Sequence, residues 1–169
     1  MSWDVMLMNV SPTIVTGDDF PEDFTSELGP RAQVLSRMTA ILPSLDLTDP
    51  TWGILDGDDF FIEFNIGDRD PVDVMTLHIR GGNGVISVIQ RICEHTGWRA
   101  FDTSTGDFID FTANPAEGLH QWRASRDQVV ASLEAEGKQV VTDVKVNKTG
   151  VDIMEITAPK RKKWWAFWK

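Results

Sequence analysis

WGILDGDDFFIEFNIGDRDPVDVMTLHIR, residues 52–80, is the stretch of sequence that decides the fold. Its first part predicts a β-hairpin with strands at Trp52–Leu55 and Asp59–Ile66, because the intervening Asp56-Gly57 supplies the positive φ angles of a tight turn. In the second strand apolar and polar residues alternate, which indicates one buried face and an antiparallel sheet. The inward-facing residues of that strand are predicted to be Phe60, Ile62, Phe64 and Ile66.

The rest of the chain adds strands and helices to this hairpin. Val72–Arg80 predicts a third strand, with Met75, Leu77 and Ile79 on its buried face. Helices are predicted where apolar residues recur at three- and four-residue spacing. The further predicted elements are helices over residues 30–42, 85–96 and 115–135, a strand at 3–8, hairpins over 98–111 and 138–157, and loops at 11–29 and 43–51.

Hairpins interrupted by helices are typical of the α+β class. We therefore expect a single domain with a mainly antiparallel sheet and two or three packed helices. Residues 1–136 form the predicted acidic α+β domain, residues 137–158 a C-terminal β-hairpin packed on it or extending it, and residues 159–169 a tail. The predicted core includes Trp3, Trp52, Phe60, Phe64, Leu77, Ile89, Ile92 and Trp98.

Composition narrows the class of protein. Hydrophobic residues make up 41% of the 169 residues, which suits a globular chain. The net charge is −10, the opposite of what binding to nucleic-acid phosphates requires, so we expect no nucleic-acid partner. Cys93 is the single cysteine, which excludes a disulfide framework. The start MSWDVMLMNV lacks the cationic segment of a signal peptide, and no apolar run is long enough to span a membrane, so a cytoplasmic protein is expected.

The last ten residues, KRKKWWAFWK, differ sharply from the rest. They hold five cations and no acid, which leaves residues 1–159 with 26 acidic and 11 basic residues, a net charge of −15. Cations and aromatic rings together favour peripheral attachment to the inner face of an anionic membrane. Docking on a partner protein or on the chain's own acidic body is the alternative. The residues predicted to bind are Lys160, Arg161, Lys162, Lys163, Trp164, Trp165, Phe167, Trp168 and Lys169.

The loop HIRGGNG, residues 78–84, follows a predicted strand and opens a predicted helix. Backbone N–H groups at a helix N-terminus suit an anion, and Arg80 stands beside them. The spacing matches no known phosphate-binding motif, so a tight strand-to-helix connection explains the glycines equally well. The candidate anion-binding residues are Arg80, Gly81, Gly82, Asn83 and Gly84.

No pattern in the sequence indicates catalysis, a cofactor or a metal. Cys93 could pair with His78, His95 or His120 as nucleophile and base, but it lies on the apolar stripe of its helix and is expected to be a small core residue. The acidic clusters have no EF-hand spacing, and aspartate is a preferred turn residue. We therefore predict no catalytic residue, no cofactor and no metal ligand.

Four stretches, SWDVM, WGILDGDDFFIEFNIG, LHIRGG and GWRAFDTSTGDFID, together resemble a family of small bacterial proteins without an assigned activity. The resemblance covers roughly residues 2–125, and residues 137–169 look like an addition to it. It implies no activity, cofactor or site residue. Similar size and acidity are found in bacterial immunity proteins, which neutralise toxins.

The sequence thus predicts a non-enzymatic interaction protein with a membrane-attaching tail. The acidity of residues 1–159 favours a basic protein as its partner, through electrostatic steering. An enzyme that binds an anionic substrate at residues 78–84 is the alternative, and a tail that docks a partner protein or the body is another.

Overall fold

The predicted hairpin is formed by β3 (Trp52–Asp56) and β4 (Phe60–Asn65), with Leu55 opposite Ile62. The Gly57 N–H donates to the Phe60 carbonyl oxygen at 2.9 Å and closes the turn. β5 (Met75–Gly81) pairs antiparallel with β4, but it begins three residues later than predicted. The backbone of Val72 instead forms hydrogen bonds with Leu28 and Gly29, at the end of the long loop. Val72 therefore does not belong to β5.

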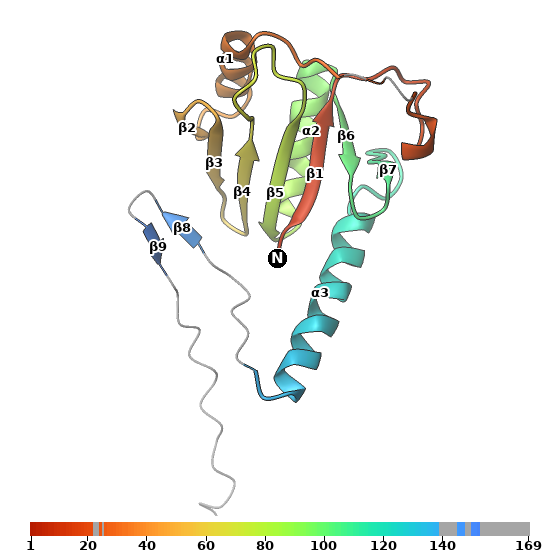
Figure 1. The fold of residues 1–169 in the computed structure, drawn as a ribbon, viewed down its shortest axis with the longest axis vertical. Coiled ribbons are helices and arrows are strands. Elements are labelled where there is room, and N and C mark those ends of the chain that lie inside the picture. Colours follow the sequence, from red (N-terminus) through yellow and green to blue (C-terminus); the bar gives the residue numbers. More distant parts are fainter. Residues whose placement is uncertain (22–23, 25, 139–144, 148–149, 153–169) are drawn as a thin grey trace, which may run out of the picture. The chain divides into compact units, whose positions relative to one another are not determined.

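This computed structural model describes residues 1–21, 24, 26–138, 145–147 and 150–152. The chain divides into two units, Met1–Gln128 and Val129–Lys169. The first unit holds one sheet of seven strands, in the order β2-β3-β4-β5-β1-β6-β7 (Figure 1). β1 (Trp3–Met8) lies between β5 and β6 (Arg99–Asp102), and β7 (Asp107–Phe108) forms the short edge next to β6. Every pair of neighbouring strands in this sheet is antiparallel.

β2 (Asp46–Asp49) corrects the prediction of a loop over residues 43–51. It pairs with β3 at only two positions, Asp46 with Ile54 and Asp49 with Trp52, and the register shifts between them. Leu45 and Leu47 alternate with Asp46 and Thr48, but the alternation is short and lies between Pro43 and Pro50, residues that are typical of loops.

Helices α1 (Arg31–Ile41) and α2 (Gly84–Thr96) pack on one face of the sheet; α2 lies behind the central strands in Figure 1 and contacts β4 and β6. Gly97 ends α2 with a φ of 77°, the left-handed conformation that glycine adopts without strain. Helix α3 (Glu117–Ala135) begins in the first unit, where Leu119 is buried. Three helices and the antiparallel sheet confirm the predicted α+β class.

Six of the eight predicted core residues are buried: Trp3, Phe64, Leu77, Ile89, Ile92 and Trp98. Trp52 and Phe60 are only half-buried, which corrects the prediction. In β3 the register turns Gly53 and Leu55 toward the core, so Trp52 projects from the opposite face. Phe60 is the first residue of β4, and its ring lies against Gly57 in the turn.

The long loop over residues 11–29 contains one short 3-10 turn, η1 (Gly17–Asp19). In the second unit, β8 (Lys145–Asn147) and β9 (Gly150–Asp152) form an antiparallel hairpin within the predicted range of 138–157. The outer parts of that predicted hairpin and the whole tail lie outside the described residues. Over the described residues, none of the helices has the length and apolarity needed to cross a membrane.

Several acidic residues act as turn formers in the pattern Asp-x-Thr. The carboxylates of Asp49 and Asp110 accept both the hydroxyl and the backbone N–H of the residue two positions later, Thr51 and Thr112. These hydrogen bonds, the hydroxyl contribution first, lower the pKa of both aspartates. Backbone N–H groups of Thr16 and Val15 likewise lower the pKa of Asp19. Turn geometry thus explains the positions of Asp19, Asp49 and Asp110.

These turns predict a loss of stability in acid. A carboxyl whose pKa is lower in the folded chain stabilises the fold above its ordinary value of 3.8, and this contribution disappears as the pH falls through the lowered value. We expect the urea midpoint of the native chain to fall below about pH 4. In the combined Asp19→Asn, Asp49→Asn and Asp110→Asn variant that fall should be smaller. An identical pH profile for both proteins would contradict the assignment.

Candidate functional site

We call the side of the sheet opposite α1 and α2 the open face. Strand alternation places Asp4 and Met6 of β1, Glu63 of β4, and His78 and Arg80 of β5 there, all with intermediate exposure. No sequence signal identified this face as a unit, because its residues come from distant strands. It has two chemically different regions, one polar and one apolar.

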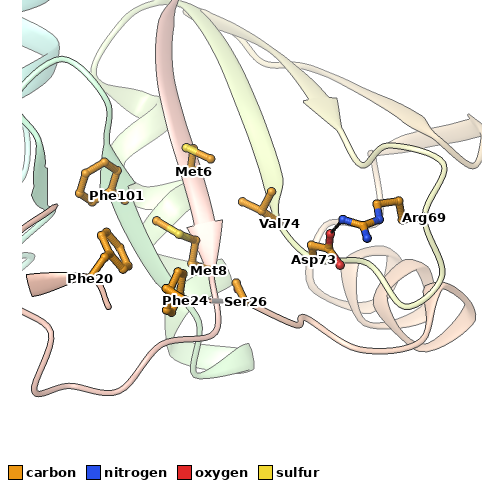
Figure 2. A pocket seen from close by; sticks show the side chains of 9 residues that line it. All are labelled: Met6, Met8, Phe20, Phe24, Ser26, Arg69, Asp73, Val74 and Phe101. Carbon is orange, nitrogen blue, oxygen red and sulfur yellow. Dashed lines mark hydrogen bonds and ion pairs between the residues drawn. The ribbon is translucent and has the colours of Figure 1, made fainter. Parts of the chain in front are cut away.

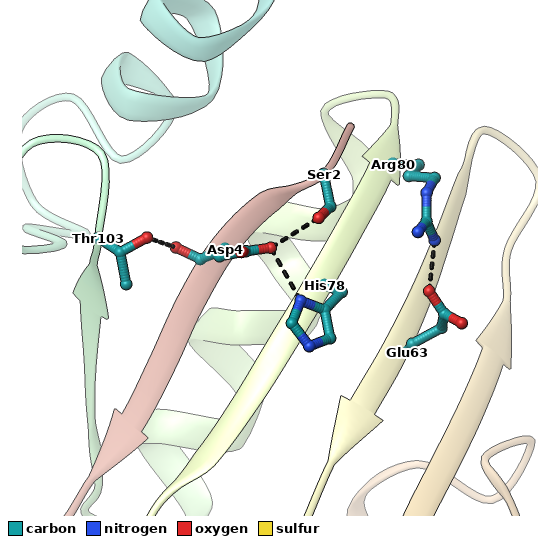
Figure 3. A network of polar contacts seen from close by, with 6 residues as sticks. All are labelled: Ser2, Asp4, Glu63, His78, Arg80 and Thr103. Carbon is teal, nitrogen blue, oxygen red and sulfur yellow. Dashed lines mark hydrogen bonds and ion pairs between the residues drawn. The ribbon is translucent and has the colours of Figure 1, made fainter. Parts of the chain in front are cut away.

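The polar region is a row of side chains on β3, β4, β5 and β1, and Figure 3 shows its members on β4, β5 and β1. The Trp52 ring stacks on His78, with 5.8 Å between centroids and 21° between planes. His78 Nδ1 lies 2.9 Å from the Asp4 carboxylate, which also accepts a hydrogen bond of 2.7 Å from the Ser2 hydroxyl. Beside it, Arg80 forms an ion pair of 2.5 Å with Glu63. The polar groups of this row are therefore partnered with one another, as expected of a surface that faces water.

The polar row has part of the geometry of a catalytic site. A carboxylate on Nδ1 orients a histidine and leaves its Nε2 to act as a base. The Ser2 hydroxyl, however, donates to Asp4 and not to His78. The row therefore does not place a hydroxyl on the histidine, which nucleophilic catalysis needs. Asp4 and His78 are 74 residues apart, so only the pairing of β1 with β5 brings them together.

Two N–H groups of the HIRGGNG loop donate to Asp59. The Gly84 N–H at the start of α2 donates to the Asp59 carboxylate at 3.2 Å, and the Gly82 N–H donates to the Asp59 carbonyl oxygen. A Cβ atom at Gly82 or Gly84 would overlap the Asp59 carboxylate, which explains both glycines. An external anion would therefore have to compete with Asp59 for the N-terminus of α2.

The other residues of this loop are also engaged. Arg80 is paired with Glu63 on the open face, as described above. Arg123 of α3 donates to the Gly81 carbonyl oxygen and, at 2.8 Å, to the Asn83 side-chain oxygen. Anion binding at Arg80–Gly84 stays a prediction, because its charged neighbours include the acidic Asp59 and Glu63 as well as the basic Arg123.

Cys93 and the three histidines do not form one cluster. Cys93 lies on α2 and packs against the core. His78 belongs to the open face, on the other side of the sheet, and the exposed His95 contacts the Arg91 carbonyl oxygen at 2.8 Å. His120 lies beside Asn83. Burial raises the pKa of the Cys93 thiol to about 12, which is the opposite of the shift that activates a cysteine nucleophile.

This environment predicts an unreactive thiol. Only the thiolate reacts, and a pKa of about 12 in place of 9.0 lowers its population at pH 8 by about a thousandfold. We expect native Cys93 to react with iodoacetamide about a thousandfold more slowly than in denaturant. Mass spectrometry of timed samples measures both rates. Similar rates in the two conditions would show that the thiol is accessible and ionisable in the folded chain.

The apolar region of the open face contains a cavity of about 470 Å³, which we call the apolar cavity (Figure 2). Met6 and Met8 of β1, Val74 beside β5 and Phe101 of β6 contribute from the sheet. Phe20 and Phe24 close it from the long loop, with 4.5 Å between their ring centroids and 5.9 Å from Phe20 to Phe101. Ser26 and the ion pair of Arg69 with Asp73 form its polar rim.

A second cavity of about 570 Å³ lies between the β6–β7 turn and the start of α3. It is lined mainly by polar groups, including the buried Asp102, whose carboxylate accepts hydrogen bonds from the N–H and hydroxyl of Ser104. Within the described part of the chain, no group of three or more His, Cys, Asp or Glu residues has the arrangement to hold a metal ion.

The predicted membrane-binding residues, Lys160–Lys169, lie outside the described residues, so their prediction rests on sequence alone. Searches of known proteins found no family model, no curated protein and no solved structure that this chain matches.

Proposed function

We propose that the protein is a non-enzymatic interaction module that its last ten residues attach reversibly to an anionic membrane surface. The observation that carries the proposal is the segregation of charge and aromatic residues along the chain. Residues 1–159 have a net charge of −15, and residues 160–169 have five cations, three tryptophans and a phenylalanine. Tryptophan and phenylalanine favour the headgroup boundary, and lysine and arginine favour anionic lipid.

The expected free energies of membrane binding support attachment without insertion. Each cation near an anionic surface contributes about 1 kcal/mol, so five contribute at most about 5 kcal/mol. Each of the four aromatic side chains adds about 1 kcal/mol when half-buried. Ordering of the segment and repulsion between the acidic body and the lipid reduce that sum to a few kcal/mol. Ten residues are also too few to span a bilayer, which needs about 20.

The acidic body is the interaction part of the proposal. A net charge of −15 speeds encounter with a basic protein, such as a toxin, and disfavours acidic partners. The alternative, an enzyme acting on an anionic substrate at residues 78–84, is less favoured because Asp59 accepts from the N–H groups of Gly82 and Gly84, and Glu63 pairs with Arg80. A tail that docks a protein would not bind vesicles, so vesicle binding distinguishes this alternative from membrane attachment.

Co-sedimentation with vesicles tests the proposal. The full chain and a chain ending at Pro159 are mixed with neutral phosphatidylcholine vesicles and with vesicles that also contain anionic phosphatidylglycerol. We expect only the full chain to pellet, and only with the anionic vesicles. Equal pelleting of the two chains would contradict the role of the tail, and pelleting without a preference for anionic lipid would contradict the role of its charge.

A further inference from the structure

The two regions of the open face differ in whether their side chains have partners. In the polar row His78 contacts both Trp52 and Asp4. These side chains therefore need no further partner and can face water at little cost in free energy. The apolar cavity instead exposes methionine and aromatic side chains around a hollow. Apolar surface that borders a cavity is stabilised when another apolar group displaces its water.

The lining of the apolar cavity suits a side chain of another molecule. Its volume of about 470 Å³ falls in the range of about 300–1,000 Å³ typical of binding pockets. Met6 and Met8 are flexible and polarisable, as in surfaces that accept apolar side chains of different shape. Phe20 and Phe101, packed edge to face, give the cavity a rigid aromatic wall.

The surroundings of the cavity favour a basic occupant. Asp18 and Asp19 precede the lining residue Phe20, and Glu27 follows Ser26. The lining cation, Arg69, is paired with Asp73, so it is neutralised at the rim. The first unit, residues 1–128, holds 21 acidic and 8 basic residues, a net charge of −13, which complements lysine and arginine.

We propose that the apolar cavity receives a large apolar side chain from a basic, amphipathic segment of a partner protein, while cations of that segment meet the acidic surface of the first unit. This rests on the proposed role of the body as an interaction module, and it assigns that role to one surface. The segment anchors through the cavity, and the charges set its approach and its specificity.

The test uses the full chain and a fluorescently labelled peptide of alternating lysines and leucines, followed by fluorescence anisotropy without lipid. Val74→Trp fills the cavity without changing charge and should weaken binding by about tenfold or more. Ile54→Trp makes the same change on the open face outside the cavity and should leave binding unchanged. Met6→Gln, close in shape to the native side chain, should also weaken binding. This variant replaces Val74→Trp in the test if Val74→Trp does not fold.

Comparison peptides separate the possible outcomes. A peptide with glutamate in place of lysine, or serine in place of leucine, should bind at least about tenfold more weakly. Unchanged binding in both cavity variants would overturn the cavity assignment and leave the interaction role intact. Failure of the full chain to bind the basic peptide at all would overturn both. Membrane attachment stands or falls separately, because no lipid is present.

Discussion

Phe64→Ala is expected to lower the free energy of unfolding by about 3–5 kcal/mol. Phe64 lies in the centre of β4, fully buried, with Gly53 of β3 and Leu77 of β5 on either side. Gly53 is tightly enclosed by Leu47, Leu45 and Phe64, so a shortened side chain leaves a cavity that these neighbours fill only in part. Urea denaturation, followed by circular dichroism, measures the change.

Phe108→Ala provides the matched control. Phe108 is half-buried in the two-residue edge strand β7, where its ring packs on Phe101 and carries the Arg99 guanidinium 3.8 Å from its centroid. We expect a loss of about 1–2 kcal/mol, because less apolar area leaves water and the edge can relax. A smaller cost for Phe64→Ala than for Phe108→Ala would contradict the assigned core.

The second large effect concerns the proposed tail. Replacing its five cations with glutamine should weaken binding to anionic vesicles by about 3–5 kcal/mol, or roughly a hundred- to several-thousandfold. Replacing its four aromatic residues with alanine should weaken it by up to about 4 kcal/mol. The two variants differ in their response to salt, because screening acts on charge and not on aromatic burial.

Vesicle binding at increasing salt therefore separates the two contributions. Residual binding of the glutamine variant should not fall as salt rises, because the charge interaction that remains is repulsion of the acidic body, which salt screens, whereas that of the alanine variant should fall. Lys138→Gln with Arg91→Gln removes two exposed cations outside the tail and should leave the binding unchanged. A loss in this control as large as in the tail variants would show that net charge, and not the tail, controls the attachment.

Elements with strong local signals were predictable from the sequence. Asp56-Gly57 and the alternation after it predicted the β3–β4 hairpin, and Gly97 predicted the end of α2. β2 was not predicted because its alternation of apolar and polar residues is short and lies between Pro43 and Pro50. The prediction that Trp52 lies in the core was wrong. Gly53, the next residue, packs against Phe64, so the Trp52 side chain lies on the opposite face of the sheet.

The candidate site was far less predictable than the fold. The contact of His78 with Asp4 depends on the pairing of β1 with β5, and the apolar cavity combines β1, β6 and the long loop. Neither the His78–Asp4 contact nor the apolar cavity produces a recognisable spacing of residues in the sequence. The HIRGGNG loop was located correctly as a strand-to-helix connection, but its main partner, Asp59, lies 25 residues from Gly84 and was not foreseen.

Fractionation of the cells that produce the protein tests the proposed membrane attachment most directly. The full chain is predicted to pellet with membranes at physiological salt and to be released at about 1 M salt, where the screening length shortens to about 3 Å. A chain ending at Pro159 is predicted to stay in the supernatant throughout. Recovery of the full chain in the supernatant at physiological salt would contradict the account. Recovery of the truncated chain in the membrane pellet would contradict it equally.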